Sequence, residues 1–357
     1  MHELSTHPIE NLHIVCIDLP CWLRFWKSGL RGVHLYYCLW QILLIIRAFK
    51  LHRTHNYDII HHLTLGNILL PTFAPLINIP FIWGPLGGGE TIPNTLISHF
   101  SISAKLQEYL RKSMIFVRRF NPLFQYCCRK AKVIIVKTEH TAKLIPHKHQ
   151  SKVIQMTDVG TAIASGGKMI VNSKNASFRI ICVGSMVAWR GFDIAIKAFA
   201  RVHGKLSNAS LRIVGDGPER RRLVEMVKED NISDKVMFIG QIEKEVLDQE
   251  MSRSDLFINP CLKEGGITIL MDAMQRGMPV ICLDTGGINN SIPGIKIPLQ
   301  CSDQIISMLA ESLLKLGQDS SLRNKIGCAC RTFAEKHTWD DKTRQLFGIY
   351  TQGTSFH

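Results

Sequence analysis

Three times in its second half, this chain runs from a short apolar strand through a glycine turn into a helix. The turns contain Gly184-Ser185, Gly215-Asp216-Gly217 and Glu264-Gly265-Gly266. Repeated strand–turn–helix units predict an α/β fold with parallel sheets. Because open α/β sheets bind ligands at the carboxyl ends of their strands, we expect the three turns to meet at one crevice.

The third turn carries the most chemical information. It lies between the apolar segment SDLFINPC, which predicts a buried strand, and an apolar helix that contains Asp272. Glycine lets a ligand approach the backbone closely, and a helix start offers unpaired N–H groups to negative oxygens. Glu264 beside such a turn suits a ligand with both hydroxyls and phosphates, such as a nucleotide sugar. One turn of this kind could equally be structural, so the interpretation depends on all three.

The length of 357 residues allows two domains, each with its own core. We predict a first domain over residues 1–165, a polar linker, a second domain over 176–338 and a last helix over 339–357 that crosses back to the first domain. In the first half we expect strands near His13–Ile17, Tyr57–Ile60, Pro80–Trp83, Val133–Lys137 and Val153–Met156. Helices are expected there over Leu35–His55, Asn67–Leu76, Ala104–Lys112, Pro122–Ala131 and Thr138–Ile145. The second half predicts strands near 178–183, 210–214, 235–239, 255–259 and 278–283.

The net charge of +14 is concentrated in the first half. Residues 1–160 hold 18 of the 43 Lys and Arg but only 8 of the 29 Asp and Glu. This imbalance favours an anionic partner, and the segment from Trp22 to Lys27 mixes aromatics and cations as membrane-interfacial segments do. The alternative is a solvated basic surface with the tryptophans in the core. Nucleic acid is the weakest candidate, because no nucleic-acid-binding module is recognisable.

Cysteine usage and the first residues indicate the compartment. The eleven cysteines are scattered without zinc-ligand spacing, which favours a reducing cytoplasm. The first dozen residues are polar, unlike a signal peptide, and the apolar run Leu35 to Ile46 is too short to span a bilayer. We therefore expect a cytoplasmic protein with possible peripheral contact at the inner face of the membrane.

Five segments in order resemble the retaining nucleotide-sugar glycosyltransferases of family four. They are VGSMVAWRGFD, LRIVGDGPERRRL, KVMFIGQI, SDLFINPCLKEGGITILMDAM and GMPVICLDTGG. The segments YDIIHHLT, PFIWGPLGGGE and VKTEHTAKLI match the same family more weakly. The resemblance implies the GT-B fold, which consists of two facing Rossmann-like domains.

The resemblance assigns roles residue by residue. It implies that Glu264 binds hydroxyls of the donor sugar and that Asp272 binds the nucleotide ribose. Arg190 matches the usual lysine that neutralises the departing diphosphate, and arginine can do so bidentately. The remaining expected substrate-binding positions are Gly184, Ser185, Gly215, Gly217, Gly265, Gly266, Ile267 and Thr268.

Two departures from the family pattern stand out. Ser185 occupies a position where many relatives have a second diphosphate-binding arginine, so leaving-group stabilisation should be weaker unless another cation compensates. The chain also opens with a segment that matches a later strand of the first domain. We therefore expect the usual first strand and glycine-rich loop to be missing and the first domain to be incomplete.

Two further clusters are expected at the crevice. His61 and His62 follow a predicted strand, in a region where the family places a histidine near the reacting centre. Gly87, Gly88 and Gly89 follow another strand, and their N–H groups could form an anion nest. Glu139 is a third candidate, with an exposed helix-start acid as the equal alternative.

The sequence therefore predicts a glycosyltransferase that moves a hexose-type sugar from a UDP- or GDP-sugar to a glycan or lipid-linked acceptor, with retention. The catalytic candidates are Glu264, Arg190, His61 and His62, and neither a metal nor another cofactor is expected. The alternative is a non-catalytic relative that binds a nucleotide sugar. A nicotinamide-dependent dehydrogenase is disfavoured, because the chain lacks G-x-G-x-x-G after a first strand.

Overall fold

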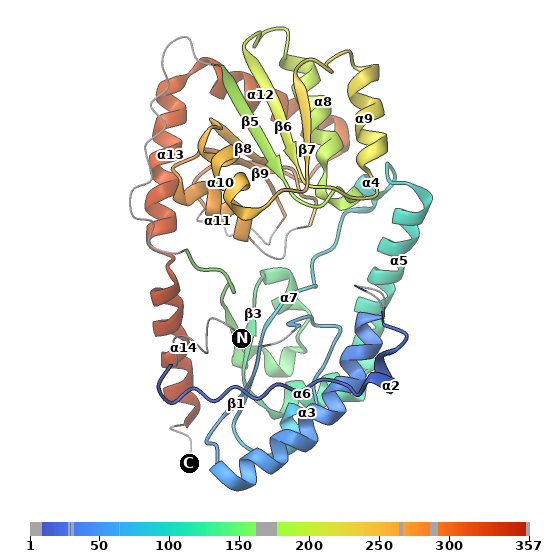
Figure 1. Cartoon of the computed structure of the whole chain (residues 1–357), viewed down its shortest axis with the longest axis vertical. Coiled ribbons are helices and arrows are strands. Elements are labelled where there is room, and N and C mark those ends of the chain that lie inside the picture. Colours follow the sequence, from blue (N-terminus) through green and yellow to red (C-terminus); the bar gives the residue numbers. More distant parts are fainter. Residues whose placement is uncertain are drawn as a thin grey trace.

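Two parallel sheets, one in each domain, form the framework of the molecule (Figure 1). The computed structural model describes residues 9–27, 29, 32–63, 65–161, 177–263, 267–285 and 292–354. The first sheet has the order β1-β2-β3-β4, and the second has the order β10-β9-β8-β5-β6-β7. The strands of the first sheet are β1 (Ile60–His62), β2 (Phe81–Leu86), β3 (Ala131–Val136) and β4 (Val153–Gln155). Those of the second are β5 (Phe178–Val183), β6 (Ala209–Val214), β7 (Val236–Gly240), β8 (Leu256–Asn259), β9 (Val280–Asp284) and β10 (Ile295–Pro298).

Helices cover both sheets. In the first domain they are α2 (Cys21–Arg24), α3 (Val33–His55), α4 (Asn94–Ile97), α5 (Ile102–Val117), α6 (Pro122–Lys130) and α7 (Glu139–Lys143). In the second they are α8 (Phe192–Val202), α9 (Arg220–Glu229), α10 (Lys244–Ser252), α11 (Thr268–Gln275), α12 (Ser302–Gln318) and α13 (Ser320–Glu335), followed by α14 (Trp339–Thr354). Short 3₁₀ turns are η1 (Ala74–Ile77), η2 (Arg118–Phe120), η3 (His147–Lys152) and η4 (Ala188–Arg190). Among these helices of the described chain, none has the length and apolarity needed to cross a membrane.

The core of the second domain follows from the apolar runs of its central strands. Ile180 and Ile181 are neighbours on β5 and are both fully buried, so both faces of the sheet are covered. Parallel sheets are buried on both faces, and their strands therefore read as continuous apolar runs. The helix pair α8 and α12 covers one face, and α11 and α13 cover the other.

The glycine turns of the second domain allow the strand ends to pack closely. Gly215 has φ +125°, and a Cβ atom there would lie 2.0 Å from the carbonyl oxygen of Gly184. A Cβ atom on Gly217 would lie 2.5 Å from the Met186 carbonyl oxygen. Only glycine fits such a close approach of two backbones. Gly215 and Gly217 therefore hold the turn after β5 in place.

The helix α14 runs from the second domain back along the first sheet, on the left of Figure 1. Ile349 packs with Ile82 of β2 and Ile135 of β3 in a small core cluster. At the crossing point, Thr161 forms an isolated parallel bridge with Thr338. The first domain thus includes the last helix of the described chain.

Two sequence-based expectations in the first half are wrong. Residues 13–17 form no strand, and Ile14 and Val15 are exposed. The expected helix Asn67–Leu76 is an irregular loop that ends in η1. The Asn67 side chain accepts a hydrogen bond from the Leu69 amide at 2.9 Å, a local bond that competes with helix formation.

Candidate functional site

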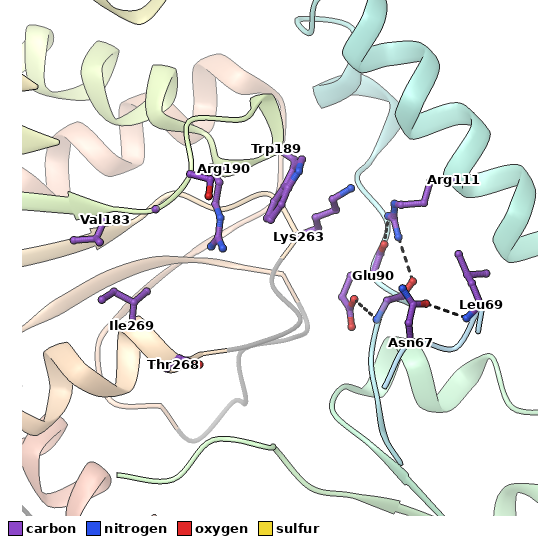
Figure 2. A pocket seen from close by; sticks show the side chains of 13 residues that line it. Asn67, Leu69, Glu90, Arg111, Val183, Trp189, Arg190, Lys263, Thr268 and Ile269 are labelled. Carbon is purple, nitrogen blue, oxygen red and sulfur yellow. Dashed lines mark hydrogen bonds between the residues drawn. The ribbon is translucent and has the colours of Figure 1, made fainter. Parts of the chain in front are cut away.

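A cavity of about 570 Å³ lies between the two domains. Its walls come from both domains, and Figure 2 shows Lys263 of the second domain directed toward Arg111 of the first. The second domain contributes Val183, Gly184, Ser185, Trp189, Arg190, Lys263, Thr268 and Ile269, and the first contributes Asn67, Leu69, Gly88, Glu90 and Arg111. The cavity thus lies at the carboxyl ends of strands, where open α/β sheets bind ligands.

The turn after β5 places Ser185 and Arg190 on the cavity wall. Gly191, with φ +68°, follows Arg190, and a Cβ atom there would lie 2.1 Å from the Pro260 carbonyl oxygen. This close approach fixes η4 against the loop that follows β8. The Arg190 guanidinium carbon lies 4.7 Å from the centroid of the Trp189 ring, a cation–π contact. The sequence expectation that Ser185 and Arg190 share one crevice agrees with this geometry.

The start of α11 forms another part of the wall. Ile267 occupies the N-cap position, and among the described residues no side chain caps the helix there. The first amides of a helix have no intrahelical acceptor, and the helix dipole places partial positive charge at this end. Thr268 at the start of α11 lines the cavity. Glu264, Gly265 and Gly266 lie outside the described residues, between Lys263 and this helix start.

Lys263 and Arg111 are cations of the cavity that the sequence interpretation missed. Both contact Glu108 of α5: Lys263 Nζ forms an ion pair with Oε2, and Arg111 Nη2 lies 2.8 Å from Oε1. Burial raises the pKa of Glu108, but hydrogen bonds from Arg111 and Lys263 outweigh it and hold that pKa below its usual value. Burial lowers the pKa of Lys263, and its hydrogen bond to Glu108 opposes that shift. Lys263 directly precedes Glu264 in the sequence, the one signal that could have identified it.

The triple-glycine loop uses its amides inside the protein, contrary to the expected anion nest. Gly87 donates to the Gly66 carbonyl at 2.7 Å, Gly88 donates to Glu90 Oε2 at 3.1 Å, and Gly89 donates to the Thr141 hydroxyl at 3.3 Å. The three amides therefore hold the loop in place by hydrogen bonds to acceptors of the first domain. Of its three glycines, Gly88 lines the cavity, so a role in substrate binding stays a prediction.

The two histidines of β1 make contacts within the first domain. His61 Nδ1 lies 2.7 Å from the Tyr350 hydroxyl, and its Nε2 lies 2.8 Å from the Gly84 carbonyl oxygen. His62 is buried, and its Nε2 lies 2.8 Å from the Tyr37 hydroxyl. Burial lowers the pKa of His61, and burial together with the His61 charge lowers that of His62 to about 4. Neither ring lines the described cavity, so the predicted catalytic role of each stays a prediction.

Asp272 and Glu139 also lie outside the described lining of the cavity. Asp272 accepts a hydrogen bond from Lys244 Nζ at 2.8 Å, on the outer side of α11 toward α10. Glu139 is exposed and pairs with Lys143 at 2.7 Å. Its position fits the alternative interpretation, an exposed acid in the first turn of a helix.

Comparison with known proteins agrees with the second-domain motifs. Residues 169–332 match the family model described as "Glycosyl transferases group 1". A GDP-mannose-dependent alpha-(1-6)-phosphatidylinositol monomannoside mannosyltransferase of Mycobacterium tuberculosis is 25% identical over 175 residues, which are 47% of this chain and 46% of that protein. The chain spans less than half the length of the first curated relatives that it matches.

Solved structures share the two-domain architecture. A glycosyltransferase from Rickettsia africae ESF-5 superposes with a TM-score of 0.66 at 15% identity, covering 100% of this chain and 88% of that one. Anabaena Alr3699/HepE in complex with UDP and glucose gives a TM-score of 0.61 at 15% identity, covering 98% and 88%. The chain therefore has the GT-B fold, and residues 169–332 are similar to the group 1 glycosyltransferases.

Proposed function

We propose that this chain is a retaining glycosyltransferase that moves a hexose-type sugar from a UDP- or GDP-sugar to a glycan or lipid-linked acceptor. The observation that carries this proposal is the interdomain cavity, which Arg190, Lys263 and Thr268 at the start of α11 line together. Support also comes from the named activity of the mycobacterial relative and from the UDP and glucose bound by Alr3699/HepE. Synthesis of cell-surface polysaccharide or glycolipid would use such a transfer.

In the proposed complex, the donor diphosphate lies against the amides at the start of α11 and the Arg190 guanidinium. Negative charge grows on the leaving diphosphate as the bond to the anomeric carbon breaks, and fixed cations and amides stabilise that charge. Glu264 accepts hydrogen bonds from the donor sugar. The acceptor hydroxyl attacks the anomeric carbon from the leaving-group side and transfers its proton to the diphosphate, which gives retention.

We propose that the reaction needs no metal. Arg190, the helix start and the neighbouring cations would take the part that a metal ion takes on a diphosphate in other enzymes. Lys263 and Arg111 line the same cavity as Ser185, so they are the candidates to replace the arginine that many relatives carry at that position. The cavity wall of the first domain, with Asn67 and Gly88, would face the acceptor.

A nucleotide-sugar-binding protein without transferase activity is the second candidate. The small, uncharged Ser185 on the cavity wall favours it, because a second cation near the leaving group is absent at that position.

The eleven cysteines form no disulfide in the structure. For either function, the compartment that we propose is the cytoplasm.

Ligand-induced shifts in melting temperature, measured with UDP, GDP and their sugars, test the donor site. Transfer and hydrolysis of the donor that binds then separate the two candidates. We expect a stabilising shift with one nucleotide, together with turnover that falls in Arg190→Ala and Glu264→Gln while both variants keep the wild-type melting temperature. Normal turnover in both variants would refute the proposed site, and binding without turnover would favour the second candidate.

A further inference from the structure

Large apolar side chains are exposed along one side of α5 and the following turn η2. Every one of them is between 47% and 86% exposed. This set, called the α5 stripe below, consists of Ile102, Leu106, Tyr109, Leu110, Met114, Phe116, Val117 and Phe120. Single exposed apolar residues are ordinary, but a contiguous row on one helix marks an interaction surface.

The helix is turned the opposite way from an ordinary surface helix. At the 3.6-residue period of a helix, the stripe residues of α5 fall within an arc of about 160°. The opposite side carries Glu108 and Ile115, which are buried, and Arg111, which lines the interdomain cavity. An ordinary surface helix points its apolar side at the core. Here the charged side faces the protein and the apolar side is exposed. The helix α5 itself lies along the right edge of Figure 1.

A basic hollow of about 670 Å³ lies at the carboxyl end of the same helix. Its lining contains five basic side chains and no acid among the described residues: Lys112, Arg118, Arg119, Lys143 and His147. The Arg119 guanidinium carbon lies 4.0 Å from the centroid of Phe116 and 4.7 Å from that of Phe120. Cations are thus interleaved with stripe residues, as they are in segments that lie in a membrane interface.

We propose that the α5 stripe and the basic hollow dock this protein on an anionic phospholipid surface. The apolar stripe would enter the boundary between headgroups and acyl chains, and the exposed Arg119 with the lysines of the hollow would contact lipid phosphates. The positive charge of the hollow identifies the binding partner, because an anionic lipid surface complements it. A second copy of this chain would bring two basic hollows together, and like charges would oppose that contact. This inference goes beyond the proposed function and does not require glycosyl transfer.

The same helix links the docking surface to the cavity. Arg111 projects from α5 into the cavity, on the side away from the stripe (Figure 2). Only the width of one helix therefore separates the docked stripe from the cavity that the proposed acceptor would enter.

Co-sedimentation with vesicles tests this proposal. The full-length chain is mixed with vesicles of phosphatidylcholine alone or of phosphatidylcholine with an equal amount of phosphatidylglycerol. We expect binding to the anionic vesicles and little binding to the neutral ones. The double variant Leu106→Gln/Leu110→Gln should weaken binding by about tenfold or more, because two apolar side chains leave the interface. Arg119→Gln should weaken it by about fivefold.

Two matched controls lie on the second domain. Met237→Gln changes an exposed apolar residue of β7, and Arg221→Gln changes an exposed cation of α9. Both should bind anionic vesicles like the wild type. Equal binding of all variants, equal binding to neutral vesicles, or a stable dimer in lipid-free solution that Leu106→Gln/Leu110→Gln dissociates would overturn the proposal. Melting-temperature shifts with UDP or GDP, measured without lipid, report separately on the donor site.

Discussion

Lys263 and Glu108 form an ion pair that joins the two domains across the cavity. Glu108 is 4% exposed, so this pair is largely shielded from solvent. Removing one partner of a buried pair leaves the other charge uncompensated and costs about 3–5 kcal/mol. Because Lys263 and Glu108 belong to different domains, losing the pair should first change the relative orientation of the two domains.

Glu108→Gln should therefore open the unliganded molecule. The Lys263 ammonium would lose its carboxylate and would gain solvation by moving away from α5. Small-angle X-ray scattering should show a larger radius of gyration than for the wild type. Glu225→Gln is the control, because it removes an exposed pair with Arg221 that is worth about 0.5 kcal/mol. An unchanged scattering profile for Glu108→Gln would show that this pair does not hold the domains together.

Arg190→Ala should lower the transfer rate by about 10²–10³-fold, the usual effect of removing one group that stabilises a leaving anion. Arg190→Lys should lower the transfer rate less, since lysine keeps the positive charge but not the bidentate hydrogen-bonding geometry of arginine. Steady-state kinetics with a saturating donor measures both. Arg253→Ala, at an exposed position after α10, should leave the rate unchanged. A rate in Arg190→Ala equal to that of the control would remove Arg190 from the proposed mechanism.

Gly215→Ala should destabilise the second domain by at least about 2 kcal/mol, because φ is +125° and the new Cβ would meet the Gly184 carbonyl oxygen. Gly204→Ala is the matched control, because nothing lies within 4 Å of its Cβ position. Thermal unfolding followed by circular dichroism compares the two variants. Similar melting temperatures would mean that the turn relaxes without cost.

Stability should fall as the pH drops from about 6.5 toward 4. The pKa of His62 is about 4 in the folded protein and 6.5 as its ordinary value, so the unfolded chain binds more protons in this window. The lost free energy of unfolding is about 3 kcal/mol. His62→Gln should flatten the fall of melting temperature with pH, whereas His55→Gln, on the exposed end of α3, should not. Identical pH profiles for wild type and His62→Gln would contradict the assignment.

The sequence predicted the second domain better than the first, for a physical reason. Strand β5 was expected at residues 178–183 and lies there, because a central parallel strand is a continuous apolar run between turn residues. Strand β10 (Ile295–Pro298) was missed because its four residues include Lys296 and end in a proline, and both residue types are depleted in strands. In the first half, residues 13–17 have the composition of a strand but no strand beside them.

The cavity was only partly predictable. Ser185, Arg190 and Thr268 follow strands of one sheet, so local motifs brought them together. Arg111 and Glu108 lie on a helix of the other domain, and their approach to Lys263 depends on how the domains face each other. No local pattern contains that information.

The bridge between Thr161 and Thr338 has a consequence for motion. There the backbone N–H of Thr161 donates to the His337 carbonyl at 2.9 Å, and that of Trp339 donates to the Thr161 carbonyl at 3.2 Å. The polypeptide passes between the lobes twice, and the two passages are tied side by side at this point. Topologically, the second domain is an insertion into the first, connected to it at both of its ends. Any opening of the cavity must bend both connections together at Thr161 and Thr338. The two domains are therefore restricted to rotation about a single axis near these residues.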